Sequence, residues 1–139
     1  MPSSAELICV DPKRVHEIWP HAKQYIRSAI DRTGLSAFED AEYDVLSGDQ
    51  LLWIAWSGKI LAAATTRLAD DGKRKVCEIV ACGGEDRDRW LPLIEQIEKY
   101  ASNEGCSSTR IIGRAGWERV LEGYRREYVI LEKSIGRNV

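Results

Sequence analysis

The sequence predicts an α/β (α+β) domain built on one mixed, mostly antiparallel sheet with helices on both faces. Three segments rich in strand-forming residues, 51–56, 59–68 and 75–82, follow one another with only turns between them, which indicates an antiparallel meander. A helical pattern and a further strand pattern at 109–112 come next, and this succession indicates a crossover between parallel strands. The meander and the crossover together predict the fold class.

The segment before the meander opens with a strand and a long helix. Residues 7–10 form a short apolar strand pattern, and Asp11 followed by Pro12 is typical of a helix start. Apolar residues then recur at three- and four-residue intervals up to Ile30, as in a helix packed on a core. Pro20 is expected to kink this helix.

A second, shorter helix is expected before the meander. Ser36 and Glu39 have the spacing of a capping box, in which each side chain satisfies a backbone N–H of the other residue. The helix should run to about Leu46 and stop at Gly48. Within the meander, turns are expected at 57–58 and at 70–72, where glycine is present.

The C-terminal half is expected to hold a long helix, a strand, a short helix and a last strand. The long helix should begin near Asp88, since Pro92 is tolerated only in a first turn, and end at Gly105. Its buried face is marked by four apolar residues, Trp90, Ile94, Ile97 and Ala101. The strand at 109–112, a helix at 117–121 and a strand at 128–131 complete the order β-α-α-β-β-β-α-β-α-β.

Composition predicts one globular domain, 1–139, with 44% hydrophobic and 30% charged residues. The net charge of −2 makes nucleic-acid binding an unlikely main activity. No secretory leader and no run of about 20 apolar residues is recognised, so neither secretion nor membrane insertion is expected. The four cysteines lack a C-x-x-C spacing and are interpreted as reduced thiols of a cytoplasmic protein. His16 and His21 lie five apart rather than four, and no metal site is predicted.

One stretch combines the end of a strand, two glycines, a charged turn and a helix start. Gly83 and Gly84 follow the strand pattern, and flexible backbone before a helix N-terminus is a common place for a bound phosphate. The turn also carries carboxylates that would repel an anion, namely Glu85, Asp86 and Asp88. Arg87 and Arg89 offer compensating positive charge.

The element order resembles that of the GNAT superfamily of acyl-CoA N-acyltransferases over nearly the whole chain. Particular motifs resemble uncharacterised GNAT-like proteins of bacteriophages and prophages: Gly83-Gly84, Trp90, Ile97-Glu98, Ala101, Gly105-Cys106, Gly113-Arg114-Ala115-Gly116-Trp117 and Leu121-Glu122-Gly123-Tyr124. The resemblance implies that acyl-CoA, with acetyl-CoA as the expected donor, lies where the strand 75–82 separates from the strand 109–112.

The resemblance also implies roles for individual residues. Pantetheine would pair with the backbone at the strand end, and the pyrophosphate would sit on the following turn; the residues expected to bind the cofactor are Ala81, Cys82, Gly83, Gly84, Arg87, Arg89 and Arg114. The segment 78–82, Glu-Ile-Val-Ala-Cys, resembles a strand of histone-acetyltransferase-type members in which the glutamate is the general base, so Glu78 is the candidate base. Tyr124 is the candidate acid.

The sequence departs from the family pattern at the phosphate loop. The superfamily uses Q/R-x-x-G-x-G/A, whereas this chain has Glu-Asp-Arg-Asp-Arg-Trp at 85–90, with Asp88 and Trp90 in the places of the two small residues. Structural interpretations stand beside the functional ones. Glu78 fits a paired or edge-exposed glutamate, the two glycines fit a simple turn, Cys82 fits a packed thiol and Trp117 fits a core residue.

Two functions from different classes follow. The first is a GNAT-fold N-acetyltransferase that moves an acetyl or short acyl group from coenzyme A to an amine. The second is a catalytically degenerate GNAT-fold protein of phage or prophage type that serves as a structural or protein-binding component. The amine acceptor or protein partner is not predicted, and self-association into a homo-oligomer is a further expectation.

Overall fold

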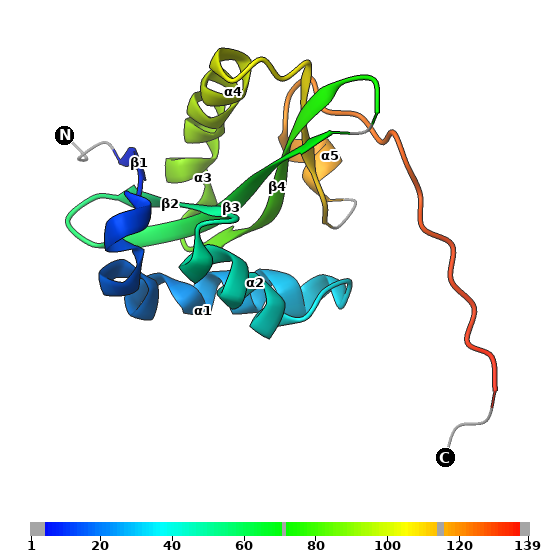
Figure 1. Cartoon of the computed structure of the whole chain (residues 1–139), viewed down its shortest axis with the longest axis horizontal. Coiled ribbons are helices and arrows are strands. Elements are labelled where there is room, and N and C mark those ends of the chain that lie inside the picture. The colour runs from blue at the N-terminus through cyan, green and yellow to red at the C-terminus, as the bar shows by residue number, and fades with distance from the viewer. Residues whose placement is uncertain (1–4, 71, 114–115, 137–139) are drawn as a thin grey trace.

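A computed structural model describes residues 5–70, 72–113 and 116–136, and shows one five-stranded sheet in the order β1-β2-β3-β4-β5 (Figure 1). Neighbouring strands are antiparallel except β4 and β5, which are parallel. The described elements are β1 (Glu6–Cys9), η1 (Pro12–Arg14), α1 (Val15–Thr33), α2 (Phe38–Ser47), β2 (Leu51–Trp56), β3 (Ile60–Asp70), β4 (Lys75–Gly84), α3 (Arg87–Trp90), η2 (Leu91–Leu93), α4 (Ile94–Asn103), β5 (Ser108–Ile111) and α5 (Trp117–Val120). The predicted mixed α+β fold is confirmed.

Helices α1 and α2 cover one face of the sheet, and α3, α4 and α5 cover the other (Figure 1). Each face has its own apolar cluster. The first contains Trp19, Ile26 and Val45, and the second contains Trp53, Ile79 and Ile97. The amphipathic patterns predict this arrangement, because a helix with one apolar stripe must bury that stripe against a sheet.

Of the two helix starts predicted from capping residues, the one at Asp11 is confirmed and the one at Ser36 is wrong. Asp11 caps η1 as predicted, since its side chain accepts a hydrogen bond from the N–H of Lys13, and α1 continues through Pro20 as one element. The capping box at Ser36 is wrong: the N-cap of α2 is Ala37, with no side-chain cap. Gly48 ends α2 with a positive φ, as predicted.

The long helix expected after β4 is divided into three short segments. Helix α3 is a single turn, Pro92 lies in the 3-10 segment η2, and α4 begins only at Ile94. Proline has no N–H to donate to the preceding turn and its ring crowds the carbonyl four residues earlier, so it ends the first turn.

Gly83 and Gly84 belong to β4, so the prediction of a simple turn there is wrong. They pair with Ala63 and Ala62 of β3, and neither has a positive φ. A Cβ on Gly83 would lie 2.9 Å from the carbonyl oxygen of Tyr25 in α1, and one on Gly84 would lie 2.5 Å from that of Leu61. The two glycines let α1 and β3 approach β4 closely.

Strand β4 runs beyond the end of its partner β5. The two strands pair only over Val76–Ile79 and Ser108–Ile111, whereas β4 continues to Gly84. At the point of separation β4 has a bulge, since Thr65 pairs with Ala81 and Thr66 with Ile79, which leaves Val80 without a partner in β3. The last five residues of β4 therefore have one edge that β5 does not cover.

The strand predicted at 128–131 is not formed. No strand is assigned over 121–136, and the chain there leads away from the sheet in Figure 1. The apolar residues of this segment are exposed, from 64% for Val129 to 91% for Leu131. Alternation and β-branched residues indicate a strand, but a strand also needs backbone pairing. The Tyr128 ring lies 5.4 Å from the guanidinium of Arg110 in β5, yet no strand pairing is formed there. Among the described residues, no helix is long and apolar enough to cross a membrane.

Replacing Gly84 by alanine should destabilise the protein by about 2 kcal/mol, because the new methyl group overpacks the β3–β4 pairing at Leu61 and Ala62. Chemical denaturation measures the change. The matched control is Gly116→Ala, where a Cβ would approach only the Arg119 side chain at 3.9 Å. Equal stability of the two variants would show that Gly84 is not required by close packing.

Candidate active site

A cavity of about 1020 Å³ opens beyond the end of β5. Its walls come from the C-terminal half of α1, from α2, from the end of β4 and from α5. Five consecutive residues of β4, Val80–Gly84, contribute to it, and these are the residues that lie beyond the β5 pairing. Ala81, Cys82, Gly83 and Gly84, which the sequence predicts as cofactor-binding residues, all line this one cavity.

The backbone of β4 presents hydrogen-bonding groups on the uncovered side. The amide N–H of Glu85 donates to the carbonyl oxygen of Leu61 in β3 at 2.8 Å. Because backbone groups alternate in direction along a strand, the N–H and C=O of Gly83 also point to β3. Those of Cys82 point to the opposite side. Before the bulge, that opposite side is the one on which β5 pairs, because Ile79 accepts from Ile112 at 3.3 Å. An extended ligand can therefore take the place of a strand beside Cys82.

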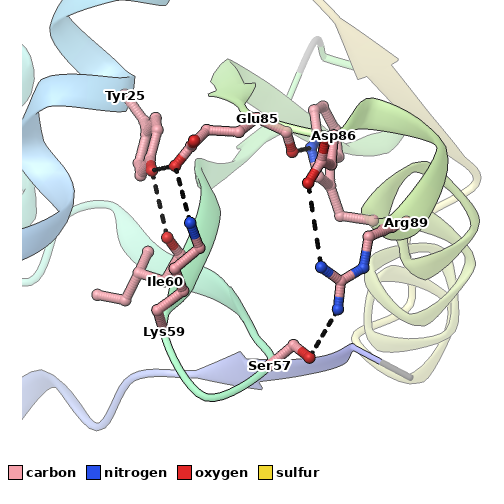
Figure 2. A network of polar contacts seen from close by, with 8 residues as sticks. Tyr25, Ser57, Lys59, Ile60, Glu85, Asp86 and Arg89 are labelled. Carbon is pink, nitrogen blue, oxygen red and sulfur yellow. Dashed lines mark hydrogen bonds and ion pairs between the residues drawn. The ribbon is translucent and has the colours of Figure 1, made fainter. Parts of the chain in front are cut away.

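Two of the three acidic side chains of the following turn, those of Glu85 and Asp86, are held by neighbouring groups (Figure 2). A carboxylate oxygen of Glu85 lies 2.8 Å from the Tyr25 hydroxyl and 3.9 Å from Lys59 Nζ. Asp86 pairs with Arg89 at 4.0 Å, and Arg89 also donates to Ser57 Oγ at 2.7 Å. These contacts lie outside the cavity, and neither carboxylate forms part of its wall.

Trp90 stands where the family pattern has a small residue, and it forms part of the wall. Its side chain is buried, its indole N–H donates to the carbonyl oxygen of Glu85 at 2.7 Å, and its ring lies 6.3 Å from that of Trp117. The Trp117 ring also accounts for the glycine at position 113, because a Cβ on that residue would lie 2.9 Å from the ring. The two tryptophans thus shape the cavity as well as the core.

Four arginines line the cavity, namely Arg32, Arg67, Arg87 and Arg119, and Arg67 is paired with Glu78. Arg87 and Arg119 line it and are exposed, and within the described ranges neither side chain has a hydrogen-bond or ion-pair partner. Arg87 is a predicted site residue; Arg119 is not, although its place in a short helix after the crossover strand is a signal in the sequence. Arg89 is held by Asp86 and Ser57 and does not line the cavity. Arg114 lies outside the described residues.

Glu78, the candidate base, is buried on β4 in two ion pairs. Its two oxygens accept from Arg67 at 2.8 Å and from Arg110 at 3.2 Å, and its side chain is 10% exposed. Glu78 does not line the cavity, but Arg67 does.

Tyr124, the candidate acid, lies on the α4 side of the sheet. Its hydroxyl donates to Glu98 at 2.8 Å and lies 2.6 Å from Thr109 Oγ1. Burial, supported by the hydrogen bond to Glu98, raises its pKa above the usual value for tyrosine. Tyr124 does not line the cavity, and these contacts tie the segment after α5 to α4 and β5.

Cys82 is a packed thiol, as the structural interpretation predicts. It is buried, and burial raises its pKa to about 12, so the thiol is protonated near neutral pH and is a poor nucleophile. Burial likewise raises the pKa of Cys77 to about 11. In the part of the chain that the structure describes, no group of three or more His, Cys, Asp or Glu side chains could hold a metal ion.

The α2 wall carries polar residues that our sequence analysis does not single out. Asp40 and Asp44 both line the cavity, and Gln50 behind them donates from Nε2 to Asp44 at 3.1 Å. The i, i+4 spacing places the two aspartates on one face of a helix, which the sequence does reveal. That this face turns to a cavity follows only from the packing of α2 against α1 and the sheet.

Comparisons with known proteins agree on the architecture. No protein-family model matches the sequence, and no curated protein does. An aminoglycoside acetyltransferase from an uncultured soil metagenomic sample, solved with sisomicin, superposes with a TM-score of 0.66 at 8% identity, over 95% of this chain and 97% of that one. The chain has a GNAT-like fold.

Two further solved structures show how widely this GNAT fold is shared. Glucosamine-6-phosphate N-acetyltransferase from Arabidopsis thaliana has a TM-score of 0.64 at 13% identity, over 96% of this chain and 99% of that one. A transcriptional regulator from Bacillus halodurans C-125 has a TM-score of 0.63 at 9% identity, over 94% and 99%. At such identities the likeness establishes the fold, and the function must be argued from the cavity.

Proposed function

We propose that this protein is an N-acetyltransferase that moves an acetyl group from acetyl-CoA to an amine. The observation that carries the proposal is the uncovered edge of β4, where the backbone of Cys82 faces a cavity of about 1020 Å³. Pantetheine is an extended chain with amide groups, so it can pair with such an edge as a strand does. Structural neighbours whose names describe acetyltransferases have the same fold.

The phosphates of acetyl-CoA would be bound by Arg87 and Arg119. Guanidinium groups bind phosphate oxygens through two parallel hydrogen bonds, and both side chains border the cavity without a partner among the described residues. The charges of Glu85 and Asp86 oppose this binding less, because Lys59 and Arg89 lie beside them at 3.9 and 4.0 Å and neither carboxylate lines the cavity. The cations therefore replace the small residues of the family's loop.

In the proposed reaction the amine nitrogen attacks the thioester carbonyl carbon directly. A C–N bond forms, the C–S bond breaks, coenzyme A leaves as the thiolate, and the amine gives up one proton. Glu78 is the proposed acceptor of that proton, with Arg67 moving aside to open one of its oxygens. A positioned carboxylate of this kind contributes about 10²–10⁴ in rate. Tyr124 is not needed as an acid, because a thiolate can take its proton from water.

Removing either cavity arginine should weaken acetyl-CoA binding. We expect Arg87→Ala and Arg119→Ala each to raise the Kd for acetyl-CoA about tenfold, measured by isothermal titration calorimetry, because each loses a charge-assisted hydrogen bond to phosphate. The matched control is Arg89→Ala, which removes an arginine of the same turn that is held outside the cavity. Wild-type protein that does not bind acetyl-CoA at millimolar concentration would overturn the proposed function.

Replacing Glu78 by glutamine should lower kcat at least 100-fold and leave the Kd for acetyl-CoA unchanged, since the amide cannot take a proton. A coupled assay for released thiol measures kcat. Arg110→Gln is the companion variant, because it breaks the ion pair on the far oxygen of Glu78 while keeping the carboxylate. Undiminished turnover in Glu78→Gln would remove Glu78 from the mechanism.

The second candidate, a non-catalytic GNAT-fold protein, is favoured by the C-terminal segment. Tyr128, Val129, Ile130 and Leu131 are all more than 60% exposed, and a run of exposed apolar residues usually marks a protein contact. The resemblance to phage and prophage proteins belongs to this candidate and rests on sequence motifs alone. It predicts a partner or a homo-oligomer that dissociates when 128–136 is deleted, measured by light scattering. An active monomer would contradict it.

A further inference from the structure

We propose that the acceptor is an α-amino acid and that Arg67 selects it by binding its carboxylate. This inference rests on the proposed function and names the substrate class of the same cavity. Arg67 lies on β3 and lines the cavity, and its side chain is 44% exposed. Among the described residues, the one partner of its guanidinium is Glu78, the proposed base, which does not line the cavity.

The ion pair with Glu78 uses only part of the Arg67 guanidinium. Its Nε donates to Glu78 Oε1 at 2.8 Å. A guanidinium has several further N–H donors in the same plane, and in the described ranges those of Arg67 have no partner. Such donors bind a carboxylate through two parallel hydrogen bonds. Arg67 can therefore bind the carboxylate of a ligand in the cavity.

Arg110 holds Glu78 from the other side. Its Nη1 lies 3.2 Å from Glu78 Oε2, and Arg110 does not line the cavity. The Glu78 side chain is only 10% exposed, so the loss of one of its two partners leaves charge at a poorly solvated position, which is costly. The proposed reaction requires Arg67 to leave Oε1. The group that replaces Arg67 at this oxygen must therefore be a cation.

An amino acid zwitterion meets this requirement because it carries charges of both signs. Its ammonium group takes the place of Arg67 at Glu78, and its carboxylate becomes the new partner of Arg67. One ion pair is exchanged for two, and no charge is left alone, whereas a simple amine would leave the guanidinium without a partner. Because Arg67 and Glu78 are in direct contact, the two charged groups of the acceptor must lie only a few atoms apart, as they do in an α-amino acid.

The other charges of the cavity are compatible with a zwitterion. Among the described residues, its wall carries four arginines and two carboxylates. Arg87 and Arg119 are the proposed ligands of the acetyl-CoA phosphates. The rest of the wall then has two arginines and two aspartates, namely Arg32, Arg67, Asp40 and Asp44. A zwitterion has no net charge for this balanced set to oppose.

The proton transfers follow the proposed reaction. The bound ammonium loses a first proton to water, which gives the nitrogen the lone pair that attacks the thioester carbonyl carbon. The C–N bond forms and the nitrogen gives a second proton to Glu78, while the C–S bond breaks and coenzyme A leaves as the thiolate. The carboxylate of the acceptor takes no part in these steps and stays on Arg67, so Arg67 determines specificity and orients the acceptor.

Competition between the common L-amino acids and their carboxamides, measured by mass spectrometry of the N-acetyl products, tests this inference. The carboxamide keeps the shape of the acid and removes its charge, and its less basic amino group favours it as a nucleophile. In one equimolar mixture the ratio of products reports the ratio of kcat/KM. We expect the acids to be preferred at least about tenfold, Arg67→Gln to remove the preference, and Arg67→Lys to keep part of it.

The matched control is Arg32→Gln, which should keep the preference. It removes an arginine that also lines the cavity and that is not one of the two ion-pair partners of Glu78. A second readout needs no turnover. Without acetyl-CoA, the Nε–Hε NMR signal of Arg67 should shift when the acids are added and should not shift with the carboxamides.

Equal acetylation of acids and carboxamides, no product from either, or an equal loss of preference in Arg32→Gln and Arg67→Gln would overturn the inference. Its failure is distinguishable from failure of the proposed function. Protein that binds acetyl-CoA and does not prefer the acids overturns the amino-acid inference alone, whereas protein that does not bind acetyl-CoA overturns the acetyltransferase. Circular dichroism and an unchanged Kd for acetyl-CoA check that each variant is folded.

Discussion

The rest of the site depends on the last five residues of β4, Val80–Gly84, which extend beyond the end of β5. Over Val76–Ile79 the strand is paired on both sides, and beyond the bulge at Val80 it is paired only with β3. The far edge would be a row of unpaired backbone groups, which proteins normally cover. Here the cavity occupies that edge, so the same interruption of the sheet supplies both the space and the hydrogen-bonding groups for a ligand.

The charged residues of the turn after β4 differ in whether they line the cavity. In the sequence the turn 85–89 reads as three carboxylates and two arginines, which gives no clear preference for an anion. In the structure Glu85 and Asp86 are paired with neighbouring side chains (Figure 2). Neither lines the cavity, whereas Arg87 does.

Sequence patterns predict the parts of the fold that depend on local periodicity. The strand 51–56 is confirmed to the residue, and the crossover from β4 to β5 follows from the alternation of strand and helix patterns. The errors occur where the structure of a segment depends on pairing with a segment distant in the sequence. Gly83 and Gly84 look like a turn, but β3 pairs with them, and 128–131 looks like a strand, but its backbone does not pair with the free edge of β5. Pro92 divides a helix whose apolar spacing is otherwise continuous.

The candidate site likewise has residues that the sequence predicts and residues that only the packing reveals. The resemblance to the superfamily singles out Ala81–Gly84 and Arg87 as cofactor-binding residues, and in the structure these residues line one cavity. The sequence does not separate Arg87 from Arg89, since both are arginines of one turn and only packing decides which borders the cavity. It also does not reveal that Asp40, Asp44 and Gln50 share a wall with β4, because those residues meet only after α2 packs on α1.

The central claim is that acetyl-CoA pairs with the uncovered edge of β4. Amide hydrogen exchange, followed by NMR with and without saturating acetyl-CoA, tests it most directly. The N–H of Cys82 should exchange at least about tenfold more slowly with ligand, because it gains a hydrogen bond. The N–H of Gly83, which faces β3, should stay protected in both states. Unchanged exchange at Cys82 in the saturated protein would contradict the account.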